Sequence, residues 1–291
     1  MAKRKQKSKG NRGGRARAKR GGPSIASRAD IHELYESAVQ SAENDLDFFS
    51  STFRELSGRD PKSLREDFCG TAQLATKWCE RDADHSAIGI DIDAETLAWG
   101  KARHLADQPA LANRVRLICG DVREPDGIQV DFSCALNFSF CVFKTRDELR
   151  RYFEVAHAGL KPDGVLFLEL YGGTEAIIAY EEEREVEGFT YKWDQERFNP
   201  LTHETLCHIH FMFPDGSKIY RAFSYDWRLW TIPEIRELLA EAGFSDMRVF
   251  WEQVEADDEG EGDDMEGTGE YCEVIEVENQ ESWIVYLAAQ V

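Results

Sequence analysis

Long apolar runs, paired cysteines and phosphate-binding glycine motifs are all missing from this sequence of 291 residues. No apolar stretch approaches the roughly 18 residues that a membrane span needs, and no signal-peptide core follows the basic start, so we expect a cytoplasmic protein. The seven cysteines are scattered, odd in number and never spaced as C-x-x-C. This pattern indicates reduced thiols and argues against a disulfide framework or a zinc ribbon.

Acidic residues are absent from residues 1–22, which hold ten lysines and arginines. The whole chain has a net charge of −20, so the remainder carries −30. A segment this poor in apolar residues cannot offset the entropy of ordering, and we predict a disordered basic arm over residues 1–28. The arm could contact RNA or DNA, or it could be a solvated tail that rests on the acidic body.

Short apolar strands alternate with amphipathic helices over most of the remaining chain, in residues 29–180 and 231–291. Residues 30–57 have helical spacing and form two helices, or one helix broken near Ala42. The alternation predicts an α/β fold with a doubly wound, mostly parallel sheet. The expected strands are 63–68, 86–93, 115–121, 130–139, 164–172, 246–253 and 282–290, and the expected helices are 71–81, 94–106, 146–160 and 231–242.

Two segments depart from this alternation. Residues 181–230 alternate with period two and carry turn signals at Asn199-Pro200 and Asp215-Gly216, which predicts an antiparallel meander of about three strands. Residues 252–281 include the run "EADDEGEGDDMEGTGE", for which we predict a mobile acidic loop.

The stretch "LREDFCGTAQLA", residues 64–75, predicts a strand that turns tightly into a helix, a place where parallel sheets bind ligands. A dinucleotide site would need G-x-G-x-x-G in this turn, but only Gly70 is present, and the G-K-[ST] of a phosphate-binding loop is absent. A dehydrogenase and a nucleotide triphosphatase are therefore both disfavoured.

Three acids stand at successive strand ends. The acid that ends the first strand can accept a hydrogen bond from an ammonium group, Asp91 can accept from ribose hydroxyls, and Asp121 can accept from an adenine amino group. Ammonium, ribose and adenine without phosphate describe S-adenosylmethionine. The simpler alternatives are that Glu66 or Asp67 caps a helix, that Asp91 and Asp93 cap the next helix, and that Asp121 only ends a strand.

These residues resemble the class I S-adenosylmethionine-dependent methyltransferases over roughly residues 30–291. "EDFCGTA" is similar to the family motif D-x-G-C-G-T-G, and departs from it at Phe68 and Ala72. Asp91 and the pair Asp121-Val122 match the ribose and adenine positions, and "GLKPDGVLFLEL" and "YDWRLWTIPEIRELLAEAGF" match the later motifs. The resemblance implies a seven-stranded, mostly parallel Rossmann-like sheet with an antiparallel β insertion between strand 5 and the last helix.

The resemblance also implies a set of cofactor-binding residues, with S-adenosyl-L-homocysteine as the product. Phe68, in place of the first glycine, is expected to crowd the methionine end of the cofactor or to pack over it. The implied set is Glu66, Phe68, Cys69, Gly70, Thr71, Asp91, Ile92, Asp121, Val122 and Asn137.

Methyl transfer from a sulfonium needs positioning and exclusion of water rather than a nucleophilic residue or a metal. Candidate catalytic residues are Tyr35, Asn137 and Tyr171. The stretch "NFSF", residues 137–140, lacks the two prolines of the relatives that methylate amines of bases or glutamine, so that subclass is not supported.

The aromatic insertion resembles the β-sheet lid of small-molecule methyltransferases that act on amino acids or amino sugars. This resemblance implies lid contacts to a substrate from Trp193, Tyr225 and Trp230, although the same aromatics could simply form the core of the lid. His208 and His210 lie on one strand face, where a polar face is favoured over a metal site.

The resulting hypothesis is methyl transfer to a nitrogen or oxygen of a small molecule bound under the lid. One alternative is an RNA or ribonucleoprotein methyltransferase that uses the basic arm, residues 1–22. The other is a cofactor-binding or scaffold protein without catalysis, which the departure at Phe68 suggests.

Overall fold

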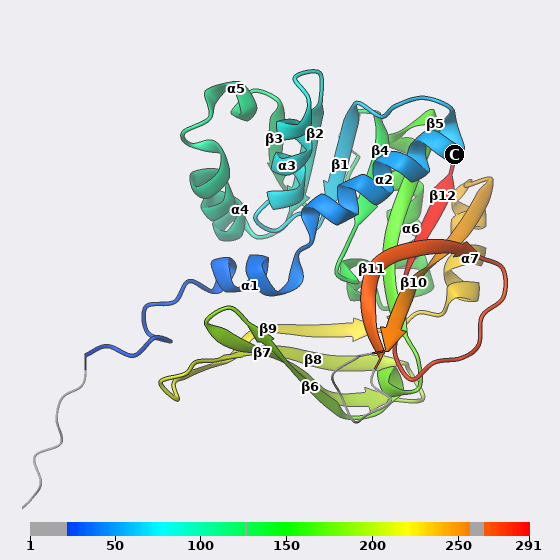
Figure 1. Cartoon of the computed structure of the whole chain (residues 1–291). Coiled ribbons are helices and arrows are strands. Elements are labelled where there is room, and N and C mark those ends of the chain that lie inside the picture. Colours follow the sequence, from blue (N-terminus) through cyan, green and yellow to red (C-terminus); the bar gives the residue numbers. More distant parts are fainter. Residues whose placement is uncertain (1–21, 126, 257–264) are drawn as a thin grey trace, which may run out of the picture.

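Two β-sheets organise the part of the chain that the computed structural model describes, residues 22–125, 127–256 and 265–291 (Figure 1). The large sheet has the strand order β11-β10-β12-β5-β4-β1-β2-β3, and the small sheet has the order β6-β7-β8-β9. No helix in these residues is long and apolar enough to cross a membrane.

The helices and strands have the following bounds. The strands of the large sheet are β1 Ser63–Asp67, β2 Ser86–Asp91, β3 Val115–Cys119, β4 Val130–Ala135, β5 Leu160–Gly172, β10 Asp246–Ala256, β11 Met265–Val274 and β12 Trp283–Gln290. Those of the small sheet are β6 Tyr180–Val186, β7 Phe189–Asn199, β8 Glu204–Met212 and β9 Lys218–Arg228. The α-helices are α1 Ile31–Val39, α2 Ala42–Ser57, α3 Gln73–Arg81, α4 Ala94–Gly100, α5 Pro109–Ala112, α6 Arg146–Ala158 and α7 Ile232–Ala242.

Strands β3, β2, β1, β4 and β5 run parallel, whereas β12, β10 and β11 add to the β5 edge in antiparallel steps. The carboxyl ends of the five parallel strands therefore meet at one edge of the sheet, where an open α/β sheet binds its ligands.

Helices cover both faces of this sheet, and the alternation along β5 shows why. Val165 and Phe167 pack into the cluster that α2 and α3 complete, while Leu166 and Leu168 pack into the cluster that α6 and α7 complete. Successive side chains of a strand point to opposite faces, so a strand buried on both faces is apolar throughout. The predicted doubly wound α/β fold is confirmed.

Local sequence signals account for the helix ends. Thr145 and Glu148 form a capping box at the start of α6, and Thr231 and Glu234 form another at the start of α7. Helix α7 ends at Gly243, whose φ of 109° is readily adopted only by glycine. Residues 30–57 form the two helices α1 and α2, with the break before Ala42.

The small sheet is inserted between β5 and α7, as the sequence pattern predicts, and α1 packs against it. Ala38 of α1 shares a core cluster with Phe189, Ile209 and Phe211 of the small sheet. In Figure 1, α1 lies between the small sheet and the rest of the large-sheet unit. Helix α1 therefore joins the two sheets at the edge where the parallel strands end.

The strand numbers differ from the sequence prediction. The large sheet has eight strands rather than seven because residues 265–274, expected within the acidic loop, pair with β10 as β11. The small sheet has four strands rather than three, since the acidic stretch 180–186 forms β6. Both are edge strands with charged side chains, and an exposed edge strand shows little of the apolar alternation that predicts buried strands. Residues 257–264 of the predicted acidic segment lie outside the described residues.

The end of the predicted basic arm is ordered. Residues 24–28 form a turn whose backbone is bound to the β8–β9 connection: the N–H of Ile25 donates to Asp215 Oδ2 at 2.9 Å, and that of Ala26 donates to Ser217 Oγ at 3.1 Å. Residues 1–21, which carry the positive charge of the arm, lie outside the described residues.

Candidate active site

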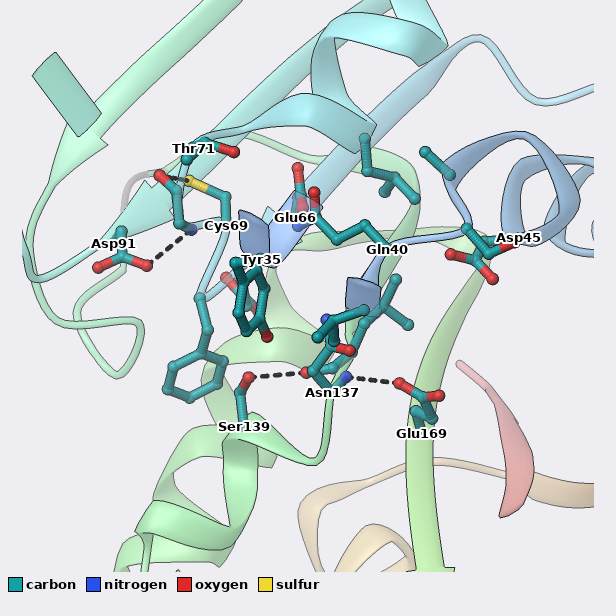
Figure 2. A pocket seen from close by; sticks show the side chains of 18 of the residues that line it. Tyr35, Gln40, Asp45, Glu66, Cys69, Thr71, Asp91, Asn137, Ser139 and Glu169 are labelled. Atoms are coloured by element: carbon teal, nitrogen blue, oxygen red, sulfur yellow. Dashed lines mark hydrogen bonds between the residues drawn. The ribbon is translucent and has the colours of Figure 1, made fainter. Parts of the chain in front are cut away.

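A pocket of about 720 Å³ lies at the carboxyl ends of the parallel strands, within the size range of small-molecule sites. Its floor comes from the ends of β1, β2, β4 and β5 and from the loop after β3. Helix α1 and strands β9 and β11 complete its walls. Figure 2 shows part of the lining. All ten residues predicted to bind a cofactor line this pocket.

The loop between β1 and α3 adopts a left-handed backbone at every second residue. The φ angles are 58° at Phe68, 52° at Gly70 and 57° at Ala72. These are the three positions at which the family motif has glycine. The loop therefore keeps the glycine-type path although two of the three residues carry side chains, at a cost of about 1–2 kcal/mol each.

Three side chains of this loop, those of Phe68, Cys69 and Thr71, make different contacts. Phe68 forms part of the pocket wall, and its ring packs against those of Phe143 and Tyr152, with both centroid separations at 5.8 Å. Cys69 is buried, and burial raises the pKa of its thiol well above the ordinary value, so it is no nucleophile at neutral pH. The hydroxyl of Thr71 donates to Glu36 of α1.

Asp91 stands at the end of β2 and braces the loop. Its Oδ2 accepts from the N–H of Gly70 at 2.8 Å (Figure 2). Its Oδ1 accepts from the N–H of Asp93 at 2.9 Å. Asp93, not Asp91, caps α4. Ile92 follows with 77% of its surface exposed at the pocket, unusual for a large apolar side chain.

Asp121 follows β3 and is paired with Arg123. The guanidinium donates from Nη2 to Oδ2 at 2.6 Å and from Nε to Oδ1 at 3.0 Å. The side-chain hydrogen bond from Arg123 is the main reason that the pKa of Asp121 lies below its ordinary value. The side chain of Val122 is buried, and its carbonyl accepts from Arg65 at 3.0 Å.

The two acids that end β1 face different surroundings. Asp67 is buried, accepts from Arg65 Nε at 2.7 Å and from the Tyr152 hydroxyl at 3.0 Å, and so belongs to a polar network in the core. Glu66 is 6% exposed and lines the pocket. Its Oε2 accepts from the N–H of Ala75 at 2.9 Å, whereas its Oε1 has no hydrogen-bond partner among the described residues. Burial raises the pKa of Glu66 to about 8.

Carboxyl groups that the sequence analysis did not single out form the opposite end of the pocket. Glu169 of β5 accepts from the N–H of Asn137, which has a φ of 51°. Asp45 of α2 accepts from the Tyr286 hydroxyl at 2.8 Å, and Glu252 of β10 accepts from the N–H of Gly269 at 3.1 Å. Nothing local in the sequence marks these three acids, because they come from three separate elements.

The candidate substrate residues divide between wall and core. Tyr35 and Tyr225 line the pocket, and burial raises the pKa of Tyr35 to about 12. Tyr171, Trp193 and Trp230 do not line it. The Tyr171 ring packs on Phe138, Trp193 packs beside Tyr225, and the indole of Trp230 donates to the Phe143 carbonyl at 3.0 Å in the core. For these three, the prediction of a direct site role does not agree with their position.

Helix α1 is tied to the large-sheet unit by polar contacts that sequence reasoning missed. Glu36 accepts from the Thr71 hydroxyl and pairs with His104 Nε2 at 2.8 Å, and Asp30 accepts from the Trp99 indole at 2.7 Å. These contacts hold Tyr35 over the pocket.

His208 and His210 each pair with one carboxylate on the small sheet, Glu196 and Asp194 respectively. No group of three or more metal-binding side chains occurs in the described part of the chain.

Comparison with known proteins identifies the domain. Residues 68–164 match the family model described as a methyltransferase domain, and no curated protein sequence matches the chain.

Three solved structures share the fold. An S-adenosylmethionine-dependent methyltransferase from Clostridium acetobutylicum aligns with a TM-score of 0.64 at 15% identity, over 90% of this chain and 97% of that one. SAM-bound CalS10, an amino pentose methyltransferase from Micromonospora echinaspora, aligns at 0.63 and 20% over 90% and 98%. The sugar N-methyltransferase KedS8 from Streptoalloteichus aligns at 0.58 and 17% over 93% and 97%. Residues 68–164 therefore match a methyltransferase domain, and the described chain shares the fold of S-adenosylmethionine-dependent methyltransferases.

Proposed function

We propose that this chain transfers the methyl group of S-adenosylmethionine to a nitrogen or oxygen of a small molecule bound beneath the small sheet, which acts as a lid. The observation that supports this most is the placement of Glu66, Asp91 and Asp121. They lie at or just beyond the carboxyl ends of three neighbouring strands and line one pocket, where an ammonium group, a ribose and an adenine would need acceptors.

Each of these side chains has acceptor capacity left for a ligand. Asp91 accepts one backbone N–H on each oxygen, and a carboxylate oxygen has two lone pairs, so both oxygens can take a ribose hydroxyl as well. Arg123 keeps Asp121 ionised and able to accept from an adenine amino group. The exposed side chain of Ile92 offers an apolar surface for one face of the base.

The charge of the pocket suits a cationic ligand. One arginine, Arg123, faces a much larger number of acids among the described lining residues: Asp45, Glu66, Asp67, Asp91, Asp121, Glu169 and Glu252. S-adenosylmethionine, when bound, supplies a methyl group activated on a positively charged sulfur. The lining residues fit S-adenosylmethionine. Glu66 Oε1 can accept a hydrogen bond from its ammonium group, and the surrounding acids favour its positive charge.

The chain's own contribution to the reaction is positioning and exclusion of water. Phe223, Tyr225 and Trp227 of β9 form the roof of the pocket, and Tyr35 of α1 closes its side. Enclosure on these sides orients a bound acceptor for an in-line displacement and removes competing water.

The acidic lining also weighs against the RNA alternative. Carboxylates repel the phosphates of a polyanion, and the described pocket offers one arginine that is already paired with Asp121. A small acceptor that enters beneath the lid is the better match to this site.

Asp91 provides the test. Calorimetric titration of S-adenosylhomocysteine and S-adenosylmethionine is expected to give binding that Asp91→Ala weakens at least tenfold, since loss of each charge-assisted hydrogen bond costs about 1.5–3 kcal/mol. Asp93→Ala is the matched control, because this neighbouring acid caps α4. We expect the control to bind within threefold of the unmodified protein. Equal affinity of Asp91→Ala and the unmodified protein, or no binding by either, would refute the proposed cofactor site.

A further inference from the structure

One end of the pocket is acidic and aromatic without any lysine or arginine among its described residues. It is formed by α2, β5, β9 and the three strands β10, β11 and β12. We call it the acceptor end, and define it by Asp45, Glu169, Glu252, Tyr225, Tyr271 and Tyr286. Except for Asn137, which follows β4, the residues matched to the cofactor lie at the other end, where β1, β2 and β3 end.

We propose that the acceptor end binds an amine and that Glu169 accepts the proton of its ammonium group before methyl transfer. This inference rests on the function proposed above and narrows it from nitrogen or oxygen nucleophiles to amines. The carboxylate of Glu169 is held in place by the N–H of Asn137 on Oε2, and its Oε1 has no partner in the described chain.

The position of Glu169 suits a residue that contacts the acceptor. It comes from β5, next to β4 in the sheet, and its bond to Asn137 ties it to the loop after β4. In Figure 2, Glu169 and Asn137 lie together at one end of the cavity, with Asp91 at the other and Tyr35 between them.

One buried acceptor in the same cavity has no hydrogen-bond partner within the described part of the protein. The Oε1 atom of Gln40 is buried and accepts no hydrogen bond, and the side chain reaches between Asp45 and Glu66 in Figure 2. Glu66 is 6% exposed, and its Oε1 is also without a partner in the described residues. A buried acceptor such as Gln40 Oε1 is normally paired, so it points to a donor on a ligand, and Glu66 Oε1 offers a second acceptor in the same cavity.

Rings complete the acceptor end as a surface for a cation. Tyr271 and Tyr286 have their centroids 4.5 Å apart, and the Tyr286 hydroxyl is fixed by Asp45. Aromatic faces beside carboxylates attract ammonium groups, whereas a neutral hydroxyl gains little from either.

The surroundings of Glu169 also favour transfer of a proton from a bound ammonium group to its carboxylate. Removal from water disfavours both the ammonium and the carboxylate, so it moves the pKa of an amine down and that of an acid up. Desolvation, reinforced by Asp45, raises the pKa of Glu169 to about 8. The titratable groups that face Glu169 are Tyr35 on α1, Asp45 on α2, Glu252 on β10, Tyr271 on β11 and Tyr286 on β12.

The step balances without a further reactant. The N–H bond of the ammonium breaks, and its proton moves to a carboxylate oxygen of Glu169, which leaves a neutral amine and a neutral acid. The nitrogen lone pair then forms the bond to the methyl carbon while the carbon–sulfur bond breaks and its electron pair stays on sulfur. The products are a methylated ammonium and neutral S-adenosylhomocysteine, and the proton on Glu169 returns to solvent.

The experiment compares the full-length protein with Glu169→Gln, which keeps an oxygen that can accept from Asn137. Protein loaded with S-adenosylhomocysteine is titrated with a panel of primary amines, amino sugars included, and with the alcohols of the same skeletons. Methyl transfer from S-adenosylmethionine to the same panel is followed from pH 6 to 10. Glu181→Gln, a change on the exposed face of β6, is the control.

We expect binding and methylation of amines rather than alcohols. At pH 7, Glu169→Gln should lower the methylation rate at least a hundredfold, as loss of a general base does, and weaken amine binding at least tenfold. The deficit in rate should narrow toward pH 10, where the amine loses its proton unaided; a residue with only a structural role would not show this narrowing. Retained S-adenosylhomocysteine binding would show that the cofactor end is intact.

Several outcomes would overturn the inference. Methylation of alcohols in preference to amines would do so, as would a Glu169→Gln rate within threefold of the unmodified protein at pH 7. Absence of any methylated amine from protein that binds S-adenosylhomocysteine would overturn the amine subsite but not the cofactor site. Failure to bind S-adenosylhomocysteine at all would instead refute the function proposed above.

Discussion

At the scale of single residues, the loop after β1 holds L-amino acids in a backbone conformation that favours glycine. Phe68 and Ala72 have φ angles of 58° and 57°, on either side of Gly70. Asp91 accepts from the N–H of Gly70, and the N–H of Cys69 donates to the Ile90 carbonyl. The bonds to β2 hold the loop in this path, so the strain is maintained by its neighbours.

This strain predicts that a glycine variant at Phe68 is more stable than an alanine variant, the reverse of the usual order. Both Phe68→Ala and Phe68→Gly lose the ring contacts with Phe143 and Tyr152, but only glycine relieves the left-handed backbone. We expect the glycine variant to be more stable than the alanine variant by about 0.5–1 kcal/mol in free energy of unfolding, measured with denaturant.

Phe143 is the control for this comparison. Its φ of −79° is ordinary for any residue, so Phe143→Ala should be more stable than Phe143→Gly. If alanine is the more stable replacement at Phe68 as well, the loop is not strained in solution.

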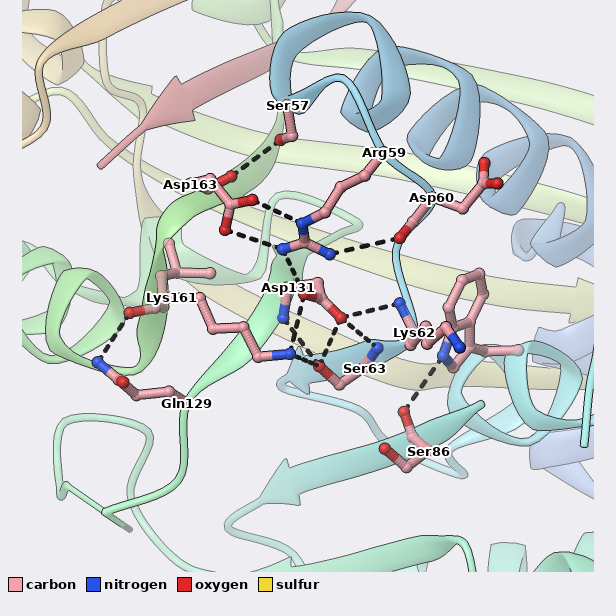
Figure 3. Close-up of polar contacts among 12 residues, drawn as sticks. Ser57, Arg59, Asp60, Lys62, Ser63, Ser86, Gln129, Asp131, Lys161 and Asp163 are labelled. Carbon is pink, nitrogen blue, oxygen red and sulfur yellow. Dashed lines mark hydrogen bonds and ion pairs between the residues drawn. The ribbon is translucent and has the colours of Figure 1, made fainter. Parts of the chain in front are cut away.

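At the scale of elements, one buried carboxylate joins three strands at the edge of the sheet opposite the pocket. Asp131 of β4 accepts from the N–H groups of Lys62 and Ser63, both at 2.8 Å, and from Lys161 at 2.9 Å (Figure 3). Arg59 also pairs with it at 2.6 Å. The start of β1, the start of β4 and the start of β5 thus share a single anchor.

Loss of the Asp131 carboxylate should destabilise the fold. Asp131→Ala leaves two backbone N–H groups without their acceptor, and we expect the free energy of unfolding to fall by about 2–4 kcal/mol. Asp163→Ala removes a more exposed partner of Arg59 and should cost less than about 1 kcal/mol. Denaturant unfolding of both variants at pH 7 measures the difference, and similar losses would contradict an anchoring role.

The contribution of Asp131 to stability should depend on pH. Burial opposes ionisation of Asp131, but hydrogen bonds from Lys161, the Lys62 N–H and Arg59 outweigh it and hold its pKa well below the ordinary value. A lowered folded-state pKa contributes stability above the unfolded value, near 4, and this contribution is lost as the pH falls. The stability gap between the unmodified protein and Asp131→Asn should therefore shrink below about pH 4.

At the scale of the whole molecule, the pocket concentrates acids inside a chain whose net charge is already −20. Burial raises the pKa of Glu66 and Glu169 to about 8 each and that of Asp45 to about 6. The folded protein therefore holds protons that the unfolded chain would release. Stability contributed by these groups is present below about pH 4.5 and declines as the pH rises to about 8.

Binding of a cation should displace these protons. Near pH 7, we expect S-adenosylmethionine to lower the pKa of the pocket acids and release protons, and to release more of them than neutral-sulfur S-adenosylhomocysteine. Calorimetric titration in two buffers with different ionisation enthalpies measures the number released. Glu66→Gln should reduce it, and binding enthalpies that do not depend on the buffer would contradict the coupling.

Much of the core could be predicted because its signals are local. Alternation of apolar strands and amphipathic helices, capping residues such as Thr145 and Thr231, and acids placed just after strands are all readable along the chain. Edge strands β6 and β11 were missed because their exposed, charged residues resemble a loop, and Trp230 was placed at the site although its ring fills the core.

The sequence by itself determined the doubly wound fold and the positions of Glu66, Asp91 and Asp121 at strand ends, since each follows from residues adjacent in the chain. Only the tertiary structure decided which side chains share the pocket. Asp45, Glu169 and Glu252 meet because β5, β12 and β10 lie in register beside α2, and such proximity depends on pairing between distant segments. Distant pairing leaves no local pattern, so the acceptor end of the pocket became visible only in the folded chain.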